Sequence, residues 1–193
     1  MARPRQFDPE ATLNQALQIF WKQGYTATSL RDLTRAMGLS KSSLYDTYGD
    51  KHRLFLATLK RYSEMVVDPM IVRLHSDRPG RPVIEEIFQD VAEGAESAGA
   101  RRGCFLANCA AELSNHDSQA AQAVVDEFRR LEDAFELAIR RGQVEGDIPA
   151  GKDARKLSRF LVSSLNGLRV TFKANPDRKL LQDVVDSVLS VLG

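Results

Sequence analysis

Apolar residues recur along this chain at the three- and four-residue intervals of an amphipathic helix, and no stretch shows the alternation of a β-strand. Asp8 followed by Pro9 predicts the start of the first helix, because an aspartate side chain caps free N–H groups and proline has none to leave free. Gly24 predicts its end. The apolar stripe of this helix consists of Leu13, Ala16, Leu17, Phe20 and Trp21.

Two short helices follow the first. Thr28 or Ser29 predicts the start of a helix that ends at Gly38, and Ser29 stands three residues before Asp32, which is the spacing of a capping box. Ser40 predicts the start of the next helix, which Gly49 ends. The inward residues of these helices are Leu30, Leu33, Met37, Leu44 and Tyr48.

The rest of the chain predicts a larger helical body. A longer helix is expected from about residue 50 with a kink at Pro69, and the proline- and glycine-containing segment 76–82 predicts a linker. The fold class is therefore all-α, with a three-helix head in residues 1–50 and a helical body in residues 51–193. Further helices are expected near residues 83–98, 103–115, 117–142, 153–174 and 177–192.

Composition and charge agree with an ordinary globular protein. Hydrophobic residues make up 43% and charged residues 27% of the chain, and no apolar run reaches the length of a membrane span. The start of the sequence, MARPRQFDPE, lacks the apolar stretch of a secretion signal, and two cysteines do not make a disulfide framework, so we expect a cytoplasmic protein without a membrane partner. Residues 1–53 carry eight Lys/Arg against five Asp/Glu, which weakly favours an anionic partner for the head.

The segment GLSKSSLYDTYGDK, residues 38–51, places small hydroxyl side chains and a lysine at a helix start. Two short helices joined by a tight turn and backed by a third match the helix-turn-helix pattern, in which the second helix enters the major groove of DNA. Lys41, Ser42 and Ser43 would let the backbone approach the duplex, and Asp46 could accept a hydrogen bond from a cytosine amino group. The same composition also fits a packing unit with solvated polar caps.

The run GYTATSLRDLTRAMGLSKSSLYDTYGDKHRLFLATL closely resembles the DNA-binding head of the TetR family of bacterial transcriptional repressors, over roughly residues 3–60. The resemblance implies that Thr28, Tyr45 and Lys51 bind phosphates and that Lys41, Ser42, Ser43 and Asp46 face bases. The chain departs from the family in having Ser42 in place of the usual glycine and Thr47-Tyr48 in place of the frequent His-Phe. The predicted DNA-contacting residues are Arg5, Thr28, Ser29, Lys41, Ser42, Ser43, Tyr45, Asp46, Thr47, Tyr48 and Lys51.

Arg5, with Arg3, precedes the first helix. Two interpretations stand side by side: an arm that enters the minor groove, or a disordered basic tail.

The resemblance also implies that the body dimerises and binds an inducer. Residues 153–174 and 177–192 each carry a broad apolar face, and two such helices from each of two chains would make a four-helix interface with two-fold symmetry. The alternative is that both faces pack inside one subunit. The predicted interface residues are Leu157, Leu161, Leu165, Leu168, Leu181, Val185, Val188 and Leu192.

The segment RRGCFLANCAAELSNHD is apolar or small almost all round, so we expect its helix to run buried through the centre of the body. Asn108 and Glu112 then need polar partners, which a ligand in a cavity, water or neighbouring side chains would supply. The residue pattern also resembles that of a TetR subgroup with members that respond to electrophiles or oxidants, which suggests Cys104 as a sensor. The simpler role of a free cysteine is packing. The candidate ligand-binding or sensing residues are Cys104, Phe105, Asn108, Cys109 and Glu112.

No enzyme is indicated. The three histidines are scattered without metal-ligand spacing and no glycine-rich phosphate loop occurs, so we expect neither a metal nor a cofactor. The sequence therefore predicts a homodimeric repressor that a small-molecule or electrophilic inducer releases from a palindromic double-stranded DNA operator. The alternative is an all-helical protein-interaction adaptor that does not bind DNA.

Overall fold

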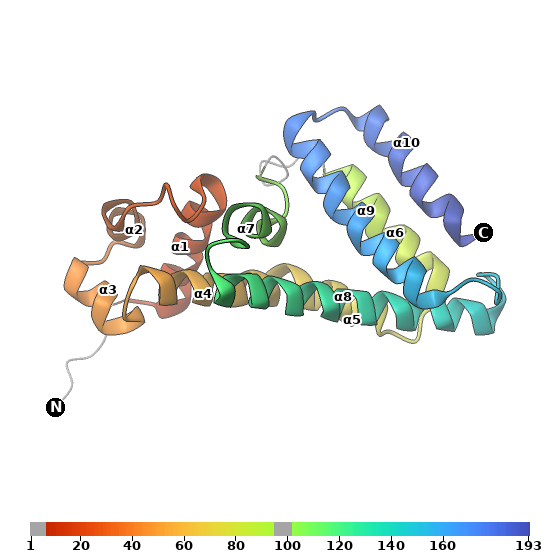
Figure 1. The fold of residues 1–193 in the computed structure, drawn as a ribbon, viewed down its shortest axis with the longest axis horizontal. Coiled ribbons are helices and arrows are strands. Elements are labelled where there is room, and N and C mark those ends of the chain that lie inside the picture. Colours follow the sequence, from red (N-terminus) through yellow and green to blue (C-terminus); the bar gives the residue numbers. More distant parts are fainter. Residues whose placement is uncertain (1–6, 95–101) are drawn as a thin grey trace.

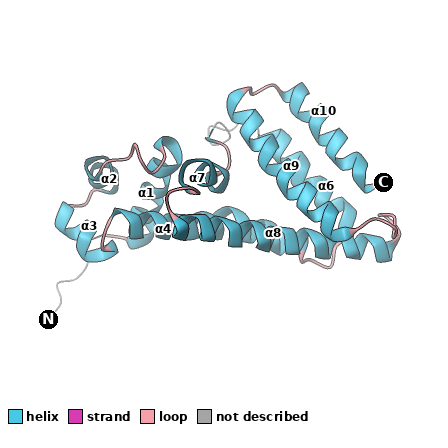
Figure 2. Cartoon of the chain, viewed as in Figure 1, coloured by secondary structure: helices cyan, strands magenta, loops and turns pink. Residues whose placement is uncertain are grey.

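The structure, a computed structural model, describes residues 7–94 and 102–193. Within those ranges every regular element is helical, which confirms the predicted fold class (Figures 1 and 2). None of these helices combines the length and the hydrophobicity that crossing a lipid bilayer requires. Arg3 and Arg5 lie outside the described residues. The α-helices are α1 (Pro9–Gln23), α2 (Leu30–Met37), α3 (Lys41–Tyr48), α4 (Lys51–Tyr62), α5 (Asp68–Leu74), α6 (Gly80–Glu93), α7 (Phe105–Leu113), α8 (Ser118–Glu145), α9 (Ala154–Ala174) and α10 (Arg178–Leu189).

The helices of the head begin and end where the sequence predicted. The carboxylate of Asp8 accepts two backbone N–H bonds at the start of α1, and Gly24 ends α1 at a φ of +82°, a conformation that side chains disfavour. Ser29 and Asp32 form the predicted capping box of α2. Ser40 caps α3 by accepting a backbone N–H bond. These local rules therefore fix where the helices of the head begin and end.

α4 connects the head to the body and contributes to both cores. Near its start, the ring of Phe55 packs edge-on against Phe20 of α1, with 5.2 Å between ring centroids. At its end, Tyr62 packs against Phe105 of α7 at 5.6 Å. The two aromatic contacts make α4 a shared element, and a domain boundary near residue 50 stays a prediction.

The break predicted at Pro69 takes the form of a π-helical turn, Ser63–Val67, immediately before it. Proline has no N–H for the carbonyl four residues earlier, and its ring crowds that carbonyl. The wider π-helical turn accommodates the mismatch without ending the helix, so α4 continues into α5.

The body is built on the long helix α8, against which α6 and α9 pack, and α10 packs on α6 and α9 (Figure 1). α6 begins at Gly80, three residues earlier than predicted. A Cβ atom at Gly80 would lie 2.1 Å from the carbonyl oxygen of Ala138 in α8, so only glycine permits this approach. The predicted linker, residues 76–82, is correspondingly shorter.

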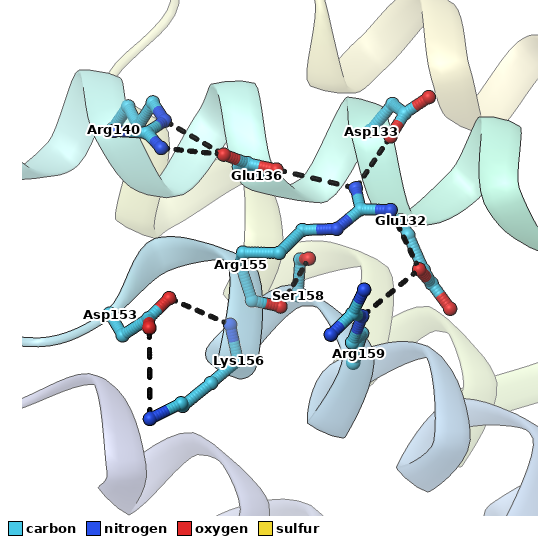
Figure 3. A network of polar contacts seen from close by, with 9 residues as sticks. All are labelled: Glu132, Asp133, Glu136, Arg140, Asp153, Arg155, Lys156, Ser158 and Arg159. Atoms are coloured by element: carbon cyan, nitrogen blue, oxygen red, sulfur yellow. Dashed lines mark hydrogen bonds and ion pairs between the residues drawn. The ribbon is translucent and has the colours of Figure 1, made fainter.

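An ion-pair network joins α8 to α9 (Figure 3). The guanidinium of Arg155 on α9 lies 3.1 Å from Glu132, 2.5 Å from Asp133 and 3.3 Å from Glu136 on α8. These side chains remain partly exposed, so each pair adds little to stability.

The predicted dimer-interface residues are mostly core residues of a single chain, and that prediction is wrong for them. α9 uses its apolar face against α8, and α10 uses its face against α6 and α9, so these side chains cannot meet a second chain. Leu157 is half-buried in the same core. The buried residues are Leu161, Leu165, Leu168, Leu181, Val185, Val188 and Leu192.

The expectation that α7 runs through the centre of the body is also wrong. This short helix packs on α8 and α4, beside α1 in Figure 1, so it lies at the junction of head and body. Phe105, Leu106, Cys109 and Leu113 are buried, whereas Ala111 is exposed. Small residues gave α7 an apolar composition without a second buried face.

Candidate nucleic-acid interface and adjoining cavity

α3 presents a polar face to solvent. Leu44 is fully buried and anchors the helix to the head, whereas Lys41, Ser42 and Asp46 are exposed. Tyr45 is 39% exposed, and the ammonium of Lys41 lies 5.9 Å from the centre of its ring. Side chains on this face are free to meet base edges and phosphates, as the recognition helix of a helix-turn-helix requires.

The first turn of α3 is lined with hydroxyl groups. The Ser40 hydroxyl lies 2.9 Å from the hydroxyls of both Ser42 and Ser43, and it accepts the N–H of Ser43 at 3.1 Å. Because these side chains are short and polar, they allow the DNA backbone to approach the N-terminus of α3 closely. Thr47, one turn further on, is half-buried.

Three predicted phosphate or base contacts are engaged in the fold instead. Thr28 is buried, and its hydroxyl donates to the carbonyl oxygen of Gly24 at 2.5 Å. The Tyr48 hydroxyl lies 3.0 Å from Thr12 Oγ1 on α1. The Ser29 side chain caps α2. These groups hold the head together, so the structure removes the hydroxyls of Thr28 and Tyr48 from the set of free phosphate donors.

Lys51, predicted to bind a phosphate, is half-buried beside the turn between α1 and α2. Its ammonium lies 4.3 Å from the centre of the Tyr25 ring, a cation–π contact. Burial lowers the pKa of Lys51, and the carboxylate of Glu112 partly offsets that effect. A phosphate contact by Lys51 would therefore compete with its contact to Tyr25.

Glu112 of α7 reaches the head. Its Oε2 accepts the backbone N–H of Tyr25 at 2.9 Å, and its Oε1 accepts that of Thr26 at 2.7 Å. Burial raises the pKa of Glu112, but these bonds and the ammonium of Lys51 outweigh burial, so the pKa lies below its ordinary value. The partner that the sequence required is thus the backbone of the α1–α2 turn rather than a ligand.

A second contact joins head and body at the start of α4. His52 Nε2 lies 2.7 Å from Asp117 Oδ2, while Asp117 Oδ1 caps α8. Burial raises the pKa of Asp117, but the N–H of Ala120 and the imidazole of His52 outweigh it, and the pKa is lowered. His52 and Asp117 stand 65 residues apart, and a pairing across that distance leaves no local signal in the sequence.

Asn108 is satisfied within the protein too. Its side-chain amide donates to the carbonyl oxygen of Arg102 at 2.9 Å, and its Oδ1 accepts a bond from Lys173 Nζ at 3.2 Å. Nearby, the indole N–H of Trp21 donates to the carbonyl oxygen of Gly103, and the Arg102 guanidinium lies 4.5 Å from the Trp21 ring centre. Neither Asn108 nor Glu112 therefore demands a ligand.

A cavity of about 350 Å³ nevertheless opens between head and body at this place. Its walls are aromatic and apolar on the side of α1 and α4, and Lys22 and Lys173 stand at its rim, exposed to solvent. Four of the five predicted ligand residues line it, and Cys104 does not. The predicted residues in the wall are Phe105, Asn108, Cys109 and Glu112.

Both cysteines are buried thiols. The Tyr62 hydroxyl donates to the sulfur of Cys104 at 3.7 Å. The guanidinium of Arg102, two residues before Cys104 in the sequence, lies over the ring of Trp21. Burial, with Cys104 and Glu112 nearby, raises the pKa of Cys109, so its thiol stays protonated. This arrangement favours packing over the sensor role that the sequence suggested for Cys104.

Known proteins share both parts of this architecture. The family model described as bacterial regulatory proteins of the tetR family matches residues 13–58, and the model for the C-terminal domain of tetracyclin-repressor-like proteins matches residues 80–188. The Bacillus subtilis helix-turn-helix-type transcriptional regulator YezE is 34% identical over the full length of both chains. The Escherichia coli repressor ComR is 27% identical over 97% of this chain and 90% of its own.

A solved structure extends the likeness to the whole fold. A cysteine variant of the TetR-family regulator CifR, complexed with 26-base-pair double-stranded operator DNA, superposes with a TM-score of 0.89 at 29% identity, covering 99% of this chain and all of that one. Fold and site together define a helix-turn-helix DNA-binding transcriptional regulator. The chain belongs to the TetR family.

Proposed function

We propose that this protein is a homodimeric repressor that binds a palindromic operator through α3 and leaves it when a small molecule occupies the cavity between head and body. The exposed polar surface of α3 supports DNA binding, because Lys41, Ser42, Tyr45 and Asp46 are all accessible there. The operator complex of the similar regulator CifR supports it. We infer regulation in the cytoplasm rather than catalysis.

The experiment is selection of binding sites from random double-stranded DNA by the purified protein, followed by titration of the selected site at several salt concentrations. We expect an inverted repeat and an affinity that falls steeply with salt, because each phosphate contact releases counterions. If no sequence is enriched and weak binding does not depend on salt, the protein-interaction adaptor is the better account.

The dimer is proposed to form through surfaces next to the faces that the sequence indicated. On α9, Phe160 and Val170 are 43% and 50% exposed, and Ser163 and Gly167 between them are small and exposed. Val184 of α10 is 38% exposed. An apolar stripe with small residues at its middle lets a second helix approach closely, and a dimer doubles the base contacts that one small head can make.

The cavity indicates the chemistry of its ligand. Its aromatic wall suits a planar or apolar body, and Lys22 and Lys173 at the rim favour an anionic group. A reversible ligand fits better than an electrophile, since both thiols are buried. The single tryptophan, Trp21, lines the cavity, so small aromatic carboxylates that bind should change its fluorescence, and those that do not alter it are not ligands of this site.

A further inference from the structure

The turn between α1 and α2 is shaped to receive a carboxylate. After Gly24 ends α1, two successive backbone N–H groups, those of Tyr25 and Thr26, point at the same side chain, Glu112 of α7. Successive N–H groups of this kind form a concave anion-binding site. Here the anion belongs to the body of the same chain.

Gly24 makes the approach of that carboxylate possible. A Cβ atom at Gly24 would lie 2.7 Å from Glu112 Oε2, closer than such atoms come, and its φ of +82° already disfavours a side chain. The residue that ends α1 thus also leaves the space that Glu112 fills. The turn and the Glu112 carboxylate therefore fit one another in shape as well as in charge.

A second carboxylate of the body holds the other end of the helix-turn-helix unit. α2 and α3 lie between the α1–α2 turn, which Glu112 holds, and the first turn of α4, where His52 pairs with Asp117 at 2.7 Å. The two acids stand at the end of α7 and the start of α8, five residues apart. The unit that carries α3 is therefore held at both of its chain ends by one short stretch of the body, and the two ends lie side by side, with 6.3 Å between the ring centroids of Tyr25 and His52.

We propose that Glu112 and Asp117 are positioning residues that set the orientation of the helix-turn-helix unit and thereby the half-site spacing that the protein accepts. This inference rests on the proposed operator-binding dimer. In such a dimer the two recognition helices must match half-sites about one helical turn, roughly 34 Å, apart or a multiple of it. A unit held at both ends presents α3 at one angle, whereas a released unit can follow half-sites at several spacings.

The test varies the spacing and leaves the half-sites unchanged. The probe is the inverted repeat selected by the wild-type protein, with one or two base pairs inserted or removed between its halves. Glu112→Gln removes the charge, and His52→Ala removes the partner of Asp117 without touching the cap that Asp117 gives α8. The matched control is Glu136→Gln, a partly buried carboxylate whose partners, Arg140 and Arg155, both lie within the body (Figure 3).

We expect wild type and Glu136→Gln to lose about tenfold or more in affinity for each altered spacing, within the usual range of coupling between sites. The double variant Glu112→Gln/His52→Ala should bind the original spacing roughly five- to tenfold more weakly and discriminate among spacings by less than about threefold, with the same half-site sequence selected. If it keeps the wild-type preference for spacing, whether or not its affinity falls, the proposal is overturned.

Two other outcomes, a double variant that does not fold and a wild-type protein that selects no inverted repeat, each have their own test. If the double variant does not fold by circular dichroism, the single variant Glu112→Gln decides the question by the same criterion. If wild-type protein selects no inverted repeat, the proposed function fails, and the hydrogen exchange of the Tyr25 and Thr26 amides still tests the contact: it should quicken in Glu112→Gln and not in Glu136→Gln. Unchanged exchange would show that Glu112 does not hold the α1–α2 turn.

Discussion

At the scale of single residues, polar groups that look suited to a ligand are largely occupied by the fold. The Thr28 hydroxyl bonds Gly24, the Tyr48 hydroxyl bonds Thr12, and the Glu112 carboxylate bonds the backbone of the α1–α2 turn. The last two partners stand 36 and 87 residues away in the sequence. The sequence indicated correctly that Glu112 needs a polar partner, but only the fold shows which partner each of these three groups has.

The lowered pKa of Glu112 predicts a pH-dependent stability. Because its folded-state pKa lies below the unfolded value of about 4.3, Glu112 contributes its full stabilisation above that pH and loses it as the pH falls through the folded-state pKa. Urea unfolding at pH 7 should show Glu112→Gln less stable than wild type by about 1 kcal/mol. The difference should shrink below about pH 4.3. If the difference in unfolding free energy between wild type and Glu112→Gln stays constant down to pH 3.5, the charge of Glu112 has no part in holding the turn.

At the scale of elements, local patterns predicted helix ends well and helix partners poorly. Asp8, Ser29 and Ser40 cap helices as expected, because each cap involves residues within three positions of the capping one. α9 was assigned the wrong outward face, because Leu161 and Val170 on opposite sides are both apolar. Hydrophobic periodicity identifies an amphipathic helix, but it cannot say which of two apolar faces meets the same chain.

The close contact of α6 with α8 gives a prediction about packing. Gly80→Ala would place a methyl group 2.1 Å from the backbone oxygen of Ala138, which cannot move away like a flexible side chain. We expect a loss of about 1–3 kcal/mol of unfolding free energy, measured by urea denaturation. Gly94→Ala, at the other end of α6 with open space around its Cβ, should change stability little. Equal effects of the two would mean that α6 and α8 lie further apart.

The accessible face of α3 gives a prediction about specificity. Lys41→Ala should change the bases enriched in a binding-site selection, because an exposed lysine at the helix start can reach base edges. Tyr45→Phe should instead weaken binding to all sequences alike, since its hydroxyl is suited to a phosphate. Lys60→Ala, an exposed lysine near the end of α4, is the control that should do neither. An unchanged consensus for Lys41→Ala would remove that residue from base recognition.

At the scale of the whole molecule, the two proposed tasks, DNA binding and dimerisation, lie toward different ends of an elongated chain. Figure 1 shows α2 and α3 at one end and α10 toward the other, with α8 running along much of the length between them. The cavity and the contacts of Glu112 and Asp117 lie where these parts meet. A ligand at this junction would act on the orientation of α3 without touching DNA, which is the geometry that release by an inducer requires.

The exposed stripe on α9 and α10 predicts where two chains meet. Val170→Asp combined with Val184→Asp should place charges in the proposed seam, where burying them without partners is costly, and so convert the dimer to monomer. Both side chains are exposed in the single chain, so the fold itself should survive, as circular dichroism would show. Val144→Asp, at the far end of α8 and 90% exposed, is the control that should leave the dimer intact. Light scattering measures the mass: a dimer in all three proteins would place the interface elsewhere, and a wild-type monomer would leave one head to bind one half-site.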